Sequence, residues 1–351
     1  MTTADGLVVG LRRPDLGGIV RDKSPGTVGD YRKRYAGWVK RLSRAREEPV
    51  SIMDLIDDLC KRAPLLQPNS YFQYRAVLIQ ELEDAVEQGD LTLERAQFLV
   101  ERIQPEEGVV IGSKVTSDRT SAGREKHIRP EGISSIRTAA CARGTPTYMN
   151  LGGIFEYGIR AGTRPCELFG ARLEGRTLII KAAKFSEQNG RGLSKDREIE
   201  LLDFDEFELD DLARLLSRLN AELAAAGGNR TLLVRRYGAA WRELRKEMPW
   251  AAKITLRTTR AQFRATMKRS GISTTELAAA LGHASAETGA SNYGAANKGW
   301  RPVPGDKPIA VLETAIKEVR VGARTKAKLA RGQPVTVTEL RLEYRRSGPQ
   351  W

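Results

Sequence analysis

Apolar and polar positions follow the period of short amphipathic helices along the N-terminal third of the chain. The first helix is predicted to begin near Ser24 or Thr27. Its apolar face consists of Val28, Tyr31, Tyr35, Trp38, Val39 and Leu42. The segment Ser51-x-x-Asp54 is similar to a capping box, so a second helix is expected to begin there and to end before Pro64.

Two further helices are predicted in the same region. One follows Asn69-Ser70 and stops at Gly89, and Thr92 caps another that runs to about Ile103. The inner face of the former is expected to consist of Phe72, Ala76, Ile79, Leu82 and Val86.

Composition divides this part of the chain into three segments. The four helices predict a helical domain over residues 24–107, and the Gly-rich residues 1–23 predict a flexible arm. Residues 108–128 follow no period and are rich in Gly, Ser, Thr and charge, which predicts a basic linker. Such a linker either lies along DNA or is a plain interdomain tether, and the tether is the simpler interpretation.

Residues 129–303 combine helical and strand patterns, which predicts a second, α+β domain. Helices are expected at about 131–142 and 146–161. Thr177–Ala183 and Arg197–Leu202 are β-branched or alternating, so they predict a hairpin with a long basic turn.

The second half of this domain is predicted to be helical. Gly227-Gly228 ends a helix lined by Leu209, Leu212, Leu216, Leu219 and Leu223, and a further helix contains Tyr237, Trp241 and Leu244. Another helix is expected over Thr258–Arg269, and Ser273-x-x-Glu276 caps a short one that Gly282 terminates.

The basic tail, residues 304–351, predicts one helix at about Pro308–Arg320 and a strand at Val335–Thr338. A lone amphipathic helix at this position packs either on its own domain or on a neighbouring protomer. The fold class that follows is mainly α with a small antiparallel β-sheet.

The charge of the chain favours a nucleic-acid partner. The net charge is +14 and the pI is about 9.8, and cationic side chains displace counterions from phosphates. A merely basic housekeeping protein is the alternative. The sequence has no apolar run of about 18 residues and no signal-peptide pattern, so we expect no membrane association and a cytoplasmic location. Three distant cysteines and two histidines fit a reducing compartment and predict neither a metal nor another cofactor.

Cations gather opposite the apolar face of the first helix, where the chain has Arg32, Lys33, Arg34, Lys40 and Arg41. This face either contacts a DNA backbone or is an ordinary solvated surface, and the pattern leaves both open. Lys114 in the linker and Lys195 in the hairpin turn are further candidates for DNA contacts.

Candidate chemistry concentrates in residues 253–300. Arg257 and Arg260 lie three residues apart, His283 follows Leu281-Gly282, and Tyr293 lies ten residues further on. Guanidinium groups, an imidazole and a phenol suit phosphodiester chemistry, in which a tyrosine attacks a phosphate held by arginines.

Three separated segments resemble the catalytic boxes of the tyrosine recombinases, the family of phage integrases, Xer and Cre. Ala161–Leu168 (AGTRPCEL) is similar to that family's T-G-L-R-x-x-E-L. Arg257-x-x-Arg260, with Phe263 and Gly271 after it, is similar to H-x-x-R, and Leu281-Gly282-His283 with Tyr293 is similar to L-G-H…Y. The resemblance covers about residues 130–300, while residues 24–104 match the family's core-binding domain in layout only.

The resemblance implies a role for each matching residue. Arg164 and Arg260 match the two arginines that stabilise the phosphorane, Tyr293 matches the nucleophile that forms a 3′-phosphotyrosine, and His283 matches the histidine that orients the phosphate or manages the tyrosine proton. Lys184 is the nearest match to the general-acid lysine, with Lys195 as the alternative, and Glu167 is expected to brace the arginines.

Two positions depart from the family pattern. Arg257 stands where the family has histidine, and an arginine donates to phosphate but does not accept a proton at neutral pH. The interval from His283 to Tyr293 is one residue longer than is usual in the family.

The function implied is site-specific recombination of DNA, in integration, excision or resolution of a mobile element. The expected partners are double-stranded DNA at a specific site, three further copies in a tetramer, and accessory DNA-bending proteins. The C-terminal helix is the candidate for docking on a neighbouring protomer. The alternatives are a type IB-like topoisomerase and a catalytically impaired DNA-binding accessory protein with the same fold.

Overall fold

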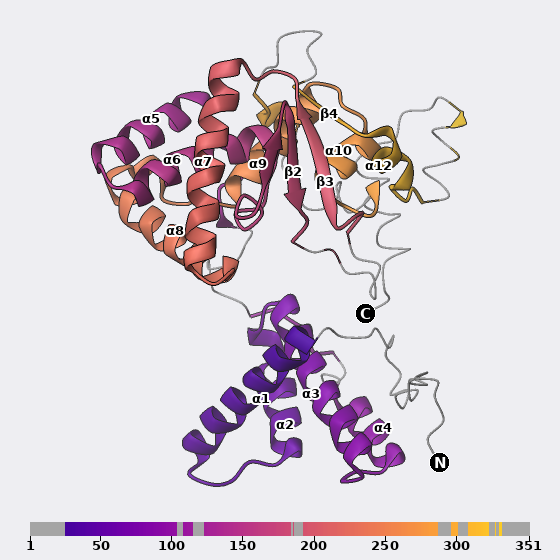
Figure 1. Ribbon diagram of the computed structural model, residues 1–351. Coiled ribbons are helices and arrows are strands. Elements are labelled where there is room, and N and C mark those ends of the chain that lie inside the picture. Colours follow the sequence, from indigo (N-terminus) through magenta and orange to yellow (C-terminus); the bar gives the residue numbers. More distant parts are fainter. Residues whose placement is uncertain are drawn as a thin grey trace, which may run out of the picture. The chain divides into compact units, whose positions relative to one another are not determined.

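The computed structural model describes residues 25–103, 108–114, 123–183, 185, 192–286, 296–300, 308–322, 327, 330 and 331. The chain divides into two compact units, Met1–Asp118 and Arg119–Trp351. It is mostly helical, and its strands form a small antiparallel sheet (Figure 1). None of the helices in the described ranges is long and apolar enough to span a membrane.

Unit 1 contains the four helices that the sequence pattern predicts: α1 (Pro25–Arg46), α2 (Ile52–Arg62), α3 (Pro68–Gln88) and α4 (Leu93–Arg102). The predicted caps are confirmed. The Ser51 side chain accepts from the Asp54 amide while the Asp54 carboxylate accepts from the Ser51 amide, and Thr92 caps α4 through the Arg95 amide. Gly89 ends α3 with φ of 79°, a conformation that glycine adopts at little cost.

The core of unit 1 corrects one detail of the helical pattern. Of the predicted inner face of α3, Leu82 is fully buried, while Phe72, Ile79 and Val86 are only partly buried. The most deeply buried apolar positions of α3 are Leu82 and, outside the predicted face, Tyr71, Val77 and Leu78. Helix α3 contacts α1, α2 and α4, so its buried surface is wider than one stripe.

Unit 2 contains six helices of seven or more residues in its described part: α5 (Pro130–Ala142), α6 (Pro146–Ala161), α7 (Glu206–Ala225), α8 (Arg230–Leu244), α9 (Thr258–Arg269) and α10 (Thr274–Ala280). These ranges agree with the sequence pattern. The apolar faces of the helices meet in one core around Phe155, Trp241 and Phe263. Because α6 and α9 pack against each other in this core, the segments that follow α6 and begin α9 are brought together.

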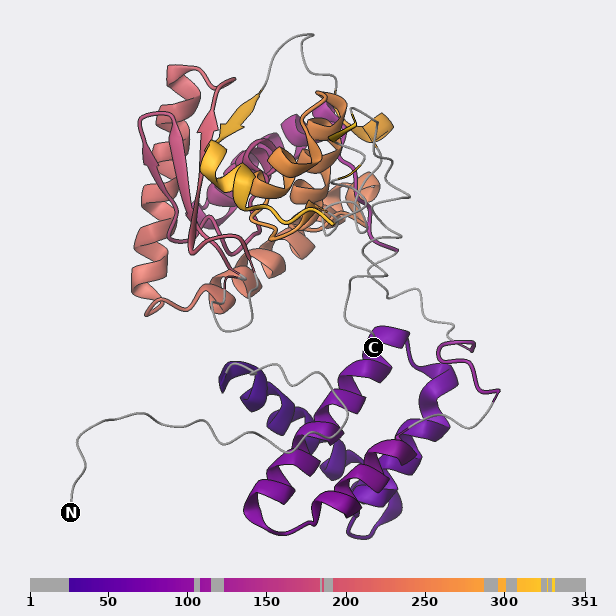
Figure 2. The same cartoon turned by 90° about the vertical axis from the view of Figure 1, so that its right-hand side faces the viewer.

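The sheet has the order β1-β2-β3-β4 and is antiparallel throughout, with strands β1 (Arg172–Glu174), β2 (Thr177–Lys181), β3 (Asp196–Leu201) and β4 (Ile309–Val311). The predicted hairpin is confirmed as β2 and β3, in which Leu178 faces Ile199. Figures 1 and 2 show the sheet between α7 on one side and α10 with α12 (Glu313–Glu318) on the other.

The predicted helix at residues 308–320 is wrong in its first half. Ile309–Val311 forms β4, which pairs with β3 so that Ile199 faces Val311, and only Glu313–Glu318 is helical. The sheet therefore takes its fourth strand from beyond residue 303, and unit 2 does not end where the sequence pattern placed its boundary. Apolar residues three and four apart fit a helix, but pairing with a distant strand decides the first three.

The segment proposed for docking on a neighbour packs on its own unit. α12 contacts α10, and Val319 is buried with Ala278, Ala279 and Ala286. The predicted strand at 335–338, the arm at 1–23 and most of the basic tail lie outside the described residues.

Candidate functional site

The segment Ala161–Leu168, the first of the three motif-like segments, forms the turn that follows α6. Gly162 ends this helix with φ of 64°, and a Cβ at this position would lie 2.4 Å from the Phe263 ring. A glycine is therefore required for α6 to end against α9. The turn places Arg164 and Glu167 together, since the Arg164 amide donates to Glu167 Oε2 at 2.7 Å and its guanidinium binds Oε1.

Glu167 is the centre of the site and is fully buried. Its Oε2 accepts from Arg197 Nη2 at 2.8 Å and lies 3.7 Å from Arg260 Nη1, and its Oε1 accepts from the Ala183 amide at 3.3 Å. Burial alone raises the pKa of this carboxyl, but the charges of Arg197, Arg260 and Arg164 outweigh it and lower the pKa to about 2. Glu167 is therefore ionised, and it holds three guanidinium groups around one point.

Arg260 joins the segment Ala161–Leu168 to the segment Leu281–His283. It lies on α9 and is only 5% exposed. Its Nη1 donates to the Gly162 carbonyl at 2.6 Å, and its Nη2 donates to the Leu281 carbonyl at 2.6 Å. The same Nη2 lies 3.2 Å from His283 Nε2. One guanidinium thus fixes the ends of two helices, α6 and α10, and contacts the histidine.

His283 follows a left-handed glycine that ends α10. Gly282 has φ of 62°, and the His283 amide donates to the Ala278 carbonyl at 2.9 Å. The ring is 7% exposed. Burial, and then the charges of Arg260, Arg264, Arg164 and Arg197, hold the pKa of this imidazole well below its usual 6.5. The ring is therefore neutral at physiological pH.

The contact with Arg260 also fixes the tautomer of His283. An arginine has no acceptor, so the lone pair of Nε2 receives the hydrogen bond and the ring proton lies on Nδ1. Nδ1 is buried and has no hydrogen-bond partner among the described residues. The neutral ring therefore presents an N–H donor, and this is the state that suits contact with an anionic oxygen.

Two buried arginines of the site were not identified from the sequence. Arg197 lies in β3 and Arg264 lies on α9, and both are almost fully buried. A signal for each is present in the pattern: strand alternation places Arg197 on the face of Ile199 and Leu201, and Arg264 lies one helical turn after Arg260.

Of the remaining catalytic candidates, the two that the structure describes, Arg257 and Lys195, are not part of this network. Arg257 is at the N-cap of α9, is exposed, and makes no hydrogen bond or ion pair with the described residues. Lys195 is also exposed, and its carbonyl accepts from the Ala182 amide at 2.8 Å. Lys184 and Tyr293 lie outside the described residues, although Ala183, next to Lys184, is bound to Glu167.

The segment that follows Tyr293 is anchored on α9. The carbonyl of Lys298 accepts from Gln262 Nε2 at 3.1 Å, and the carbonyl of Gly299 accepts from Arg269 at 2.9 Å. Trp300 donates through its amide to Thr266 and through Nε1 to the Ile128 carbonyl. On the other side, the Ala286 amide is bound to Arg320. The chain is therefore fixed at both Ala286 and 296–300, on either side of Tyr293.

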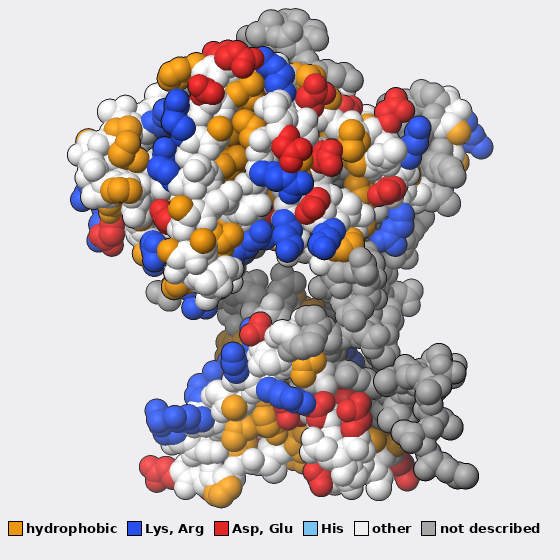
Figure 3. All heavy atoms as spheres, in the orientation of Figure 1, with side chains coloured by type: hydrophobic (Ala, Val, Ile, Leu, Met, Phe, Trp, Pro, Cys, Tyr) orange, Lys and Arg blue, Asp and Glu red, His pale blue; other side chains and the backbone are white. Residues whose placement is uncertain are grey.

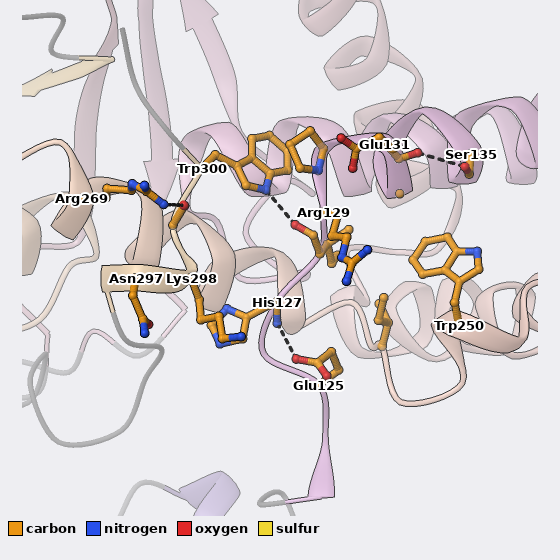
Figure 4. Close-up of a pocket in the computed structure, with 15 residues that line it drawn as sticks. Glu125, His127, Arg129, Glu131, Ser135, Trp250, Arg269, Asn297, Lys298 and Trp300 are labelled. Atoms are coloured by element: carbon orange, nitrogen blue, oxygen red, sulfur yellow. Dashed lines mark hydrogen bonds between the residues drawn. The ribbon is translucent and has the colours of Figure 1, made fainter. Parts of the chain in front are cut away.

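A surface groove of about 1250 Å³ lies beside this anchor (Figure 4). Figure 4 shows Trp250, Arg129, His127 and Trp300 around it, and none of the predicted catalytic residues that the structure describes lines it. The groove lies where the chain enters unit 2, since the Glu125 amide donates to the Lys253 carbonyl at 3.0 Å.

The predicted DNA-contacting cations of unit 1 are exposed. Lys33, Lys40 and Arg41 lie on the outer surface of α1, where Figure 3 shows Lys and Arg side chains. Arg32 is 62% exposed and pairs with Asp84 at 2.9 Å, so part of its charge is already matched. Lys114 is exposed, and its amide is bound to the Pro64 carbonyl.

The described residues include no group of three or more His, Cys, Asp or Glu side chains placed to hold a metal ion. No family model matches the chain, and no curated protein or solved structure is significantly similar to it.

Proposed function

We propose that the chain is a site-specific DNA strand-breaking and rejoining enzyme of the tyrosine recombinase type. In this reaction a tyrosine oxygen attacks a DNA phosphate, a 3′-phosphotyrosine forms, and the 5′ oxygen leaves with a proton from a general acid. A 5′-hydroxyl of another strand then reverses the step and releases the tyrosine. The observation that carries the proposal is the convergence of Arg164, Arg260 and His283, from three distant segments, around the buried Glu167.

The charge of this cluster supports binding of a phosphodiester. Three guanidinium groups pair with the single carboxylate of Glu167, so these four side chains carry a net charge of +2. The phosphorane formed during attack has extra negative charge on its non-bridging oxygens. Donors that are already fixed in a partly dry site stabilise such charge without reorganising. Arg164 is the member whose side chain is most exposed, at 18%, and in the proposal it is the one that reaches the DNA first.

His283 has a defined part in the proposed reaction. Nδ1 is buried before DNA binds, so the phosphate first displaces the groups that cover it. The neutral ring then donates from Nδ1 to a non-bridging oxygen, while Nε2 stays on Arg260. Since the ring stays neutral, it acts as a hydrogen-bond donor and not as a source of positive charge. This role differs from general-base catalysis, in which the histidine would gain a proton during attack.

The nucleophile and the general acid come from the resemblance. Tyr293 is the proposed nucleophile, since it lies three residues before the anchored segment 296–300. Lys184 is the proposed general acid, with Lys195 as the alternative, because the backbone beside Lys184 is bound to Glu167. Unit 1 would supply the core-binding domain and unit 2 the catalytic domain, acting as a tetramer on DNA.

A nicked DNA substrate tests the proposal. The sequence bound by the purified full chain is first selected from a random duplex pool. Duplexes with that sequence are then prepared with a nick at successive positions, so that the short downstream fragment is lost after cleavage. The 5′-labelled upstream strand should become bound to protein in a form that resists detergent. The Tyr293→Phe variant should give no adduct, and Tyr148→Phe, at a half-buried tyrosine of α6, should behave as wild type.

Other results of this experiment would point to a different function or to a different nucleophile. Absence of adduct with every nicked duplex, together with tight sequence-specific binding, would identify a DNA-binding accessory protein. Relaxation of a supercoiled plasmid that lacks the selected sequence would identify a topoisomerase. An adduct that persists in Tyr293→Phe would overturn the assignment of the nucleophile.

A further inference from the structure

Arg197 occupies an unusual position for a charged residue. Strand β3 alternates between exposed and buried side chains, and Arg197 takes a core-facing position together with Ile199 and Leu201. Its side chain is only 3% exposed. A buried guanidinium is costly unless it is paired and hydrogen-bonded, so the partners of Arg197 indicate what keeps it there.

The partners of Arg197 belong to two different parts of the site. Nη2 binds Glu167 Oε2 at 2.8 Å, and Nη1 donates to the Ala280 carbonyl at 2.8 Å. The methylene next to the guanidinium also lies against Gly282, since a Cβ built there would be 3.4 Å from Arg197 Cδ. Arg197 therefore spans from the carboxylate that holds Arg164 to the turn that carries His283.

A planar fork suits this bridge better than a single ammonium group. Two nitrogens of one rigid group fix the distance between Glu167 and the end of α10, whereas a lysine donates from a single nitrogen and does not hold two acceptors at a fixed separation. The Arg260 guanidinium makes a second bridge, to the Gly162 and Leu281 carbonyls. Arg197 and Arg260 together fix the position of the segment Ala161–Leu168 relative to the turn that carries His283.

We propose that Arg197 is a positioning residue for the DNA-cleavage reaction: it sets the separation between the Arg164–Glu167 pair and the His283 ring. This inference rests on the proposed function and adds to it a residue that does not itself touch the phosphate. Displacement of a reacting group by about 1 Å lowers rates by about 100-fold. Loss of the bridge therefore slows cleavage, while DNA binding through exposed cations is retained.

Arg160 provides a matched control within the same unit. It also bridges a carboxylate and a backbone carbonyl, since it binds Glu208 and donates to the Asp203 carbonyl at 3.0 Å. It stacks on Phe204 at 3.8 Å and makes no contact with Glu167 or His283 among the described residues. Arg160 is partly buried, with its side chain 18% exposed, so its substitution removes a similar arginine bridge without disturbing the site.

The kinetic experiment compares Arg197→Lys, Arg197→Met, Arg160→Lys and Arg160→Met with wild type on the nicked substrate. We expect adduct formation at saturating DNA to slow about 100-fold in Arg197→Met and about 10-fold in Arg197→Lys, with Kd changed less than about 3-fold. Both Arg160 variants should cleave at the wild-type rate. If Arg197→Met does not fold, Arg197→Lys decides the matter, and cleavage by it at the wild-type rate would overturn the proposal.

A second readout does not depend on cleavage. The chain has two histidines, so its imidazole NMR spectrum contains two ring systems, and His127→Gln assigns them. The Arg197 charge is one of those that hold the pKa of His283 low, so this pKa should rise in Arg197→Met and stay unchanged in Arg160→Met. An unchanged His283 titration in Arg197→Met would contradict the bridge. Failure of wild type to form an adduct, with the titration behaving as expected, would instead reject the proposed function and leave the geometry intact.

Discussion

The arginines of α1 in unit 1 and those of the candidate site in unit 2 are used in opposite ways. In unit 1 the cations of α1 lie on the surface, and Arg32 pairs with Asp84 while 62% exposed. In unit 2 Arg197 and Arg260 are almost fully buried, and both bind Glu167 and backbone carbonyls at the ends of helices. The same residue type therefore serves an exposed surface on α1 and a buried, hydrogen-bonded cluster in the candidate site.

This difference separates binding from chemistry in the proposed function. Exposed cations displace counterions and give affinity that depends on salt. Buried guanidinium groups are fixed before the DNA arrives, so they act on the charge that develops at the reacting phosphate. Substitution of the exposed cations should therefore change the Kd for DNA and its salt dependence, and substitution of the buried arginines should change the rate of cleavage.

The largest effect is expected for Arg260→Lys. A lysine cannot reach the Gly162 and Leu281 carbonyls together, so the link between the first and third boxes is lost with one donor to the phosphate. Adduct formation should fall by about 1000-fold with Kd changed less than about 3-fold. Arg242→Lys, at an exposed position of α8, serves as the control. If Arg260→Lys weakened DNA binding as much as it slowed adduct formation, binding and chemistry would not be carried by separate sets of residues.

The second effect is on stability. In the Glu167→Gln variant three guanidinium groups lose their carboxylate, which should lower the free energy of unfolding by about 3 kcal/mol. Denaturant unfolding measures the change, and Glu243→Gln, an exposed pair with Lys246, should change it by less than about 0.5 kcal/mol. Because the folded pKa of Glu167, about 2, lies below its usual 4.5, the difference between wild type and variant should be full above pH 4.5. It should disappear as the pH falls towards 2.

The third effect is a pH dependence from His283. Its folded pKa lies below 6.5, so the unfolded chain binds more protons as the pH falls. Wild-type stability should therefore decrease below pH 6.5, by up to about 1.4 kcal/mol per pH unit from this group. In His283→Asn that decrease should be reduced to the part that comes from His127, whose pKa burial also lowers. Unfolding curves at pH 7 and pH 5 measure it, and the same slope in both proteins would mean that the ring is not held neutral.

The smallest effects are expected on the surface of unit 1. Removal of Lys33, Lys40 or Arg41, each to alanine, should weaken DNA binding by about 10-fold or less and reduce the salt dependence by about one ion each. Cleavage at saturating DNA should be unchanged. Binding titrations at several salt concentrations measure this, and unchanged slopes would identify an ordinary solvated face.

The sequence was most informative where local chemistry decides the structure. Ser51 with Asp54, Thr92 and Gly89 define helix ends through their own hydrogen bonds or backbone conformation, so these boundaries agree with the pattern. The segment at 309–311 was misassigned because its strand exists only through pairing with β3, more than 100 residues earlier in the chain. The spacing of its apolar residues fits a helix equally well.

The residues of the candidate site also differ in whether local sequence or tertiary packing identifies them. Arg164, Arg260 and His283 belong to recognisable motifs, and the structure brings them together. Arg197 belongs to no motif, and its role depends on which side of the sheet faces the end of α10. Its place beside Ile199 in a strand that alternates polar and apolar residues was the available signal.

The most direct test of the account is to identify the residue that becomes linked to DNA. The detergent-resistant adduct from the nicked duplex is digested with protease and nuclease, and the peptide that retains a nucleotide is sequenced by mass spectrometry. We predict a single phosphodiester on Tyr293, formed by wild type and by Arg160→Met and formed much more slowly by Arg197→Met. A nucleotide on any other side chain, or binding of the selected DNA with no covalent product, would contradict it.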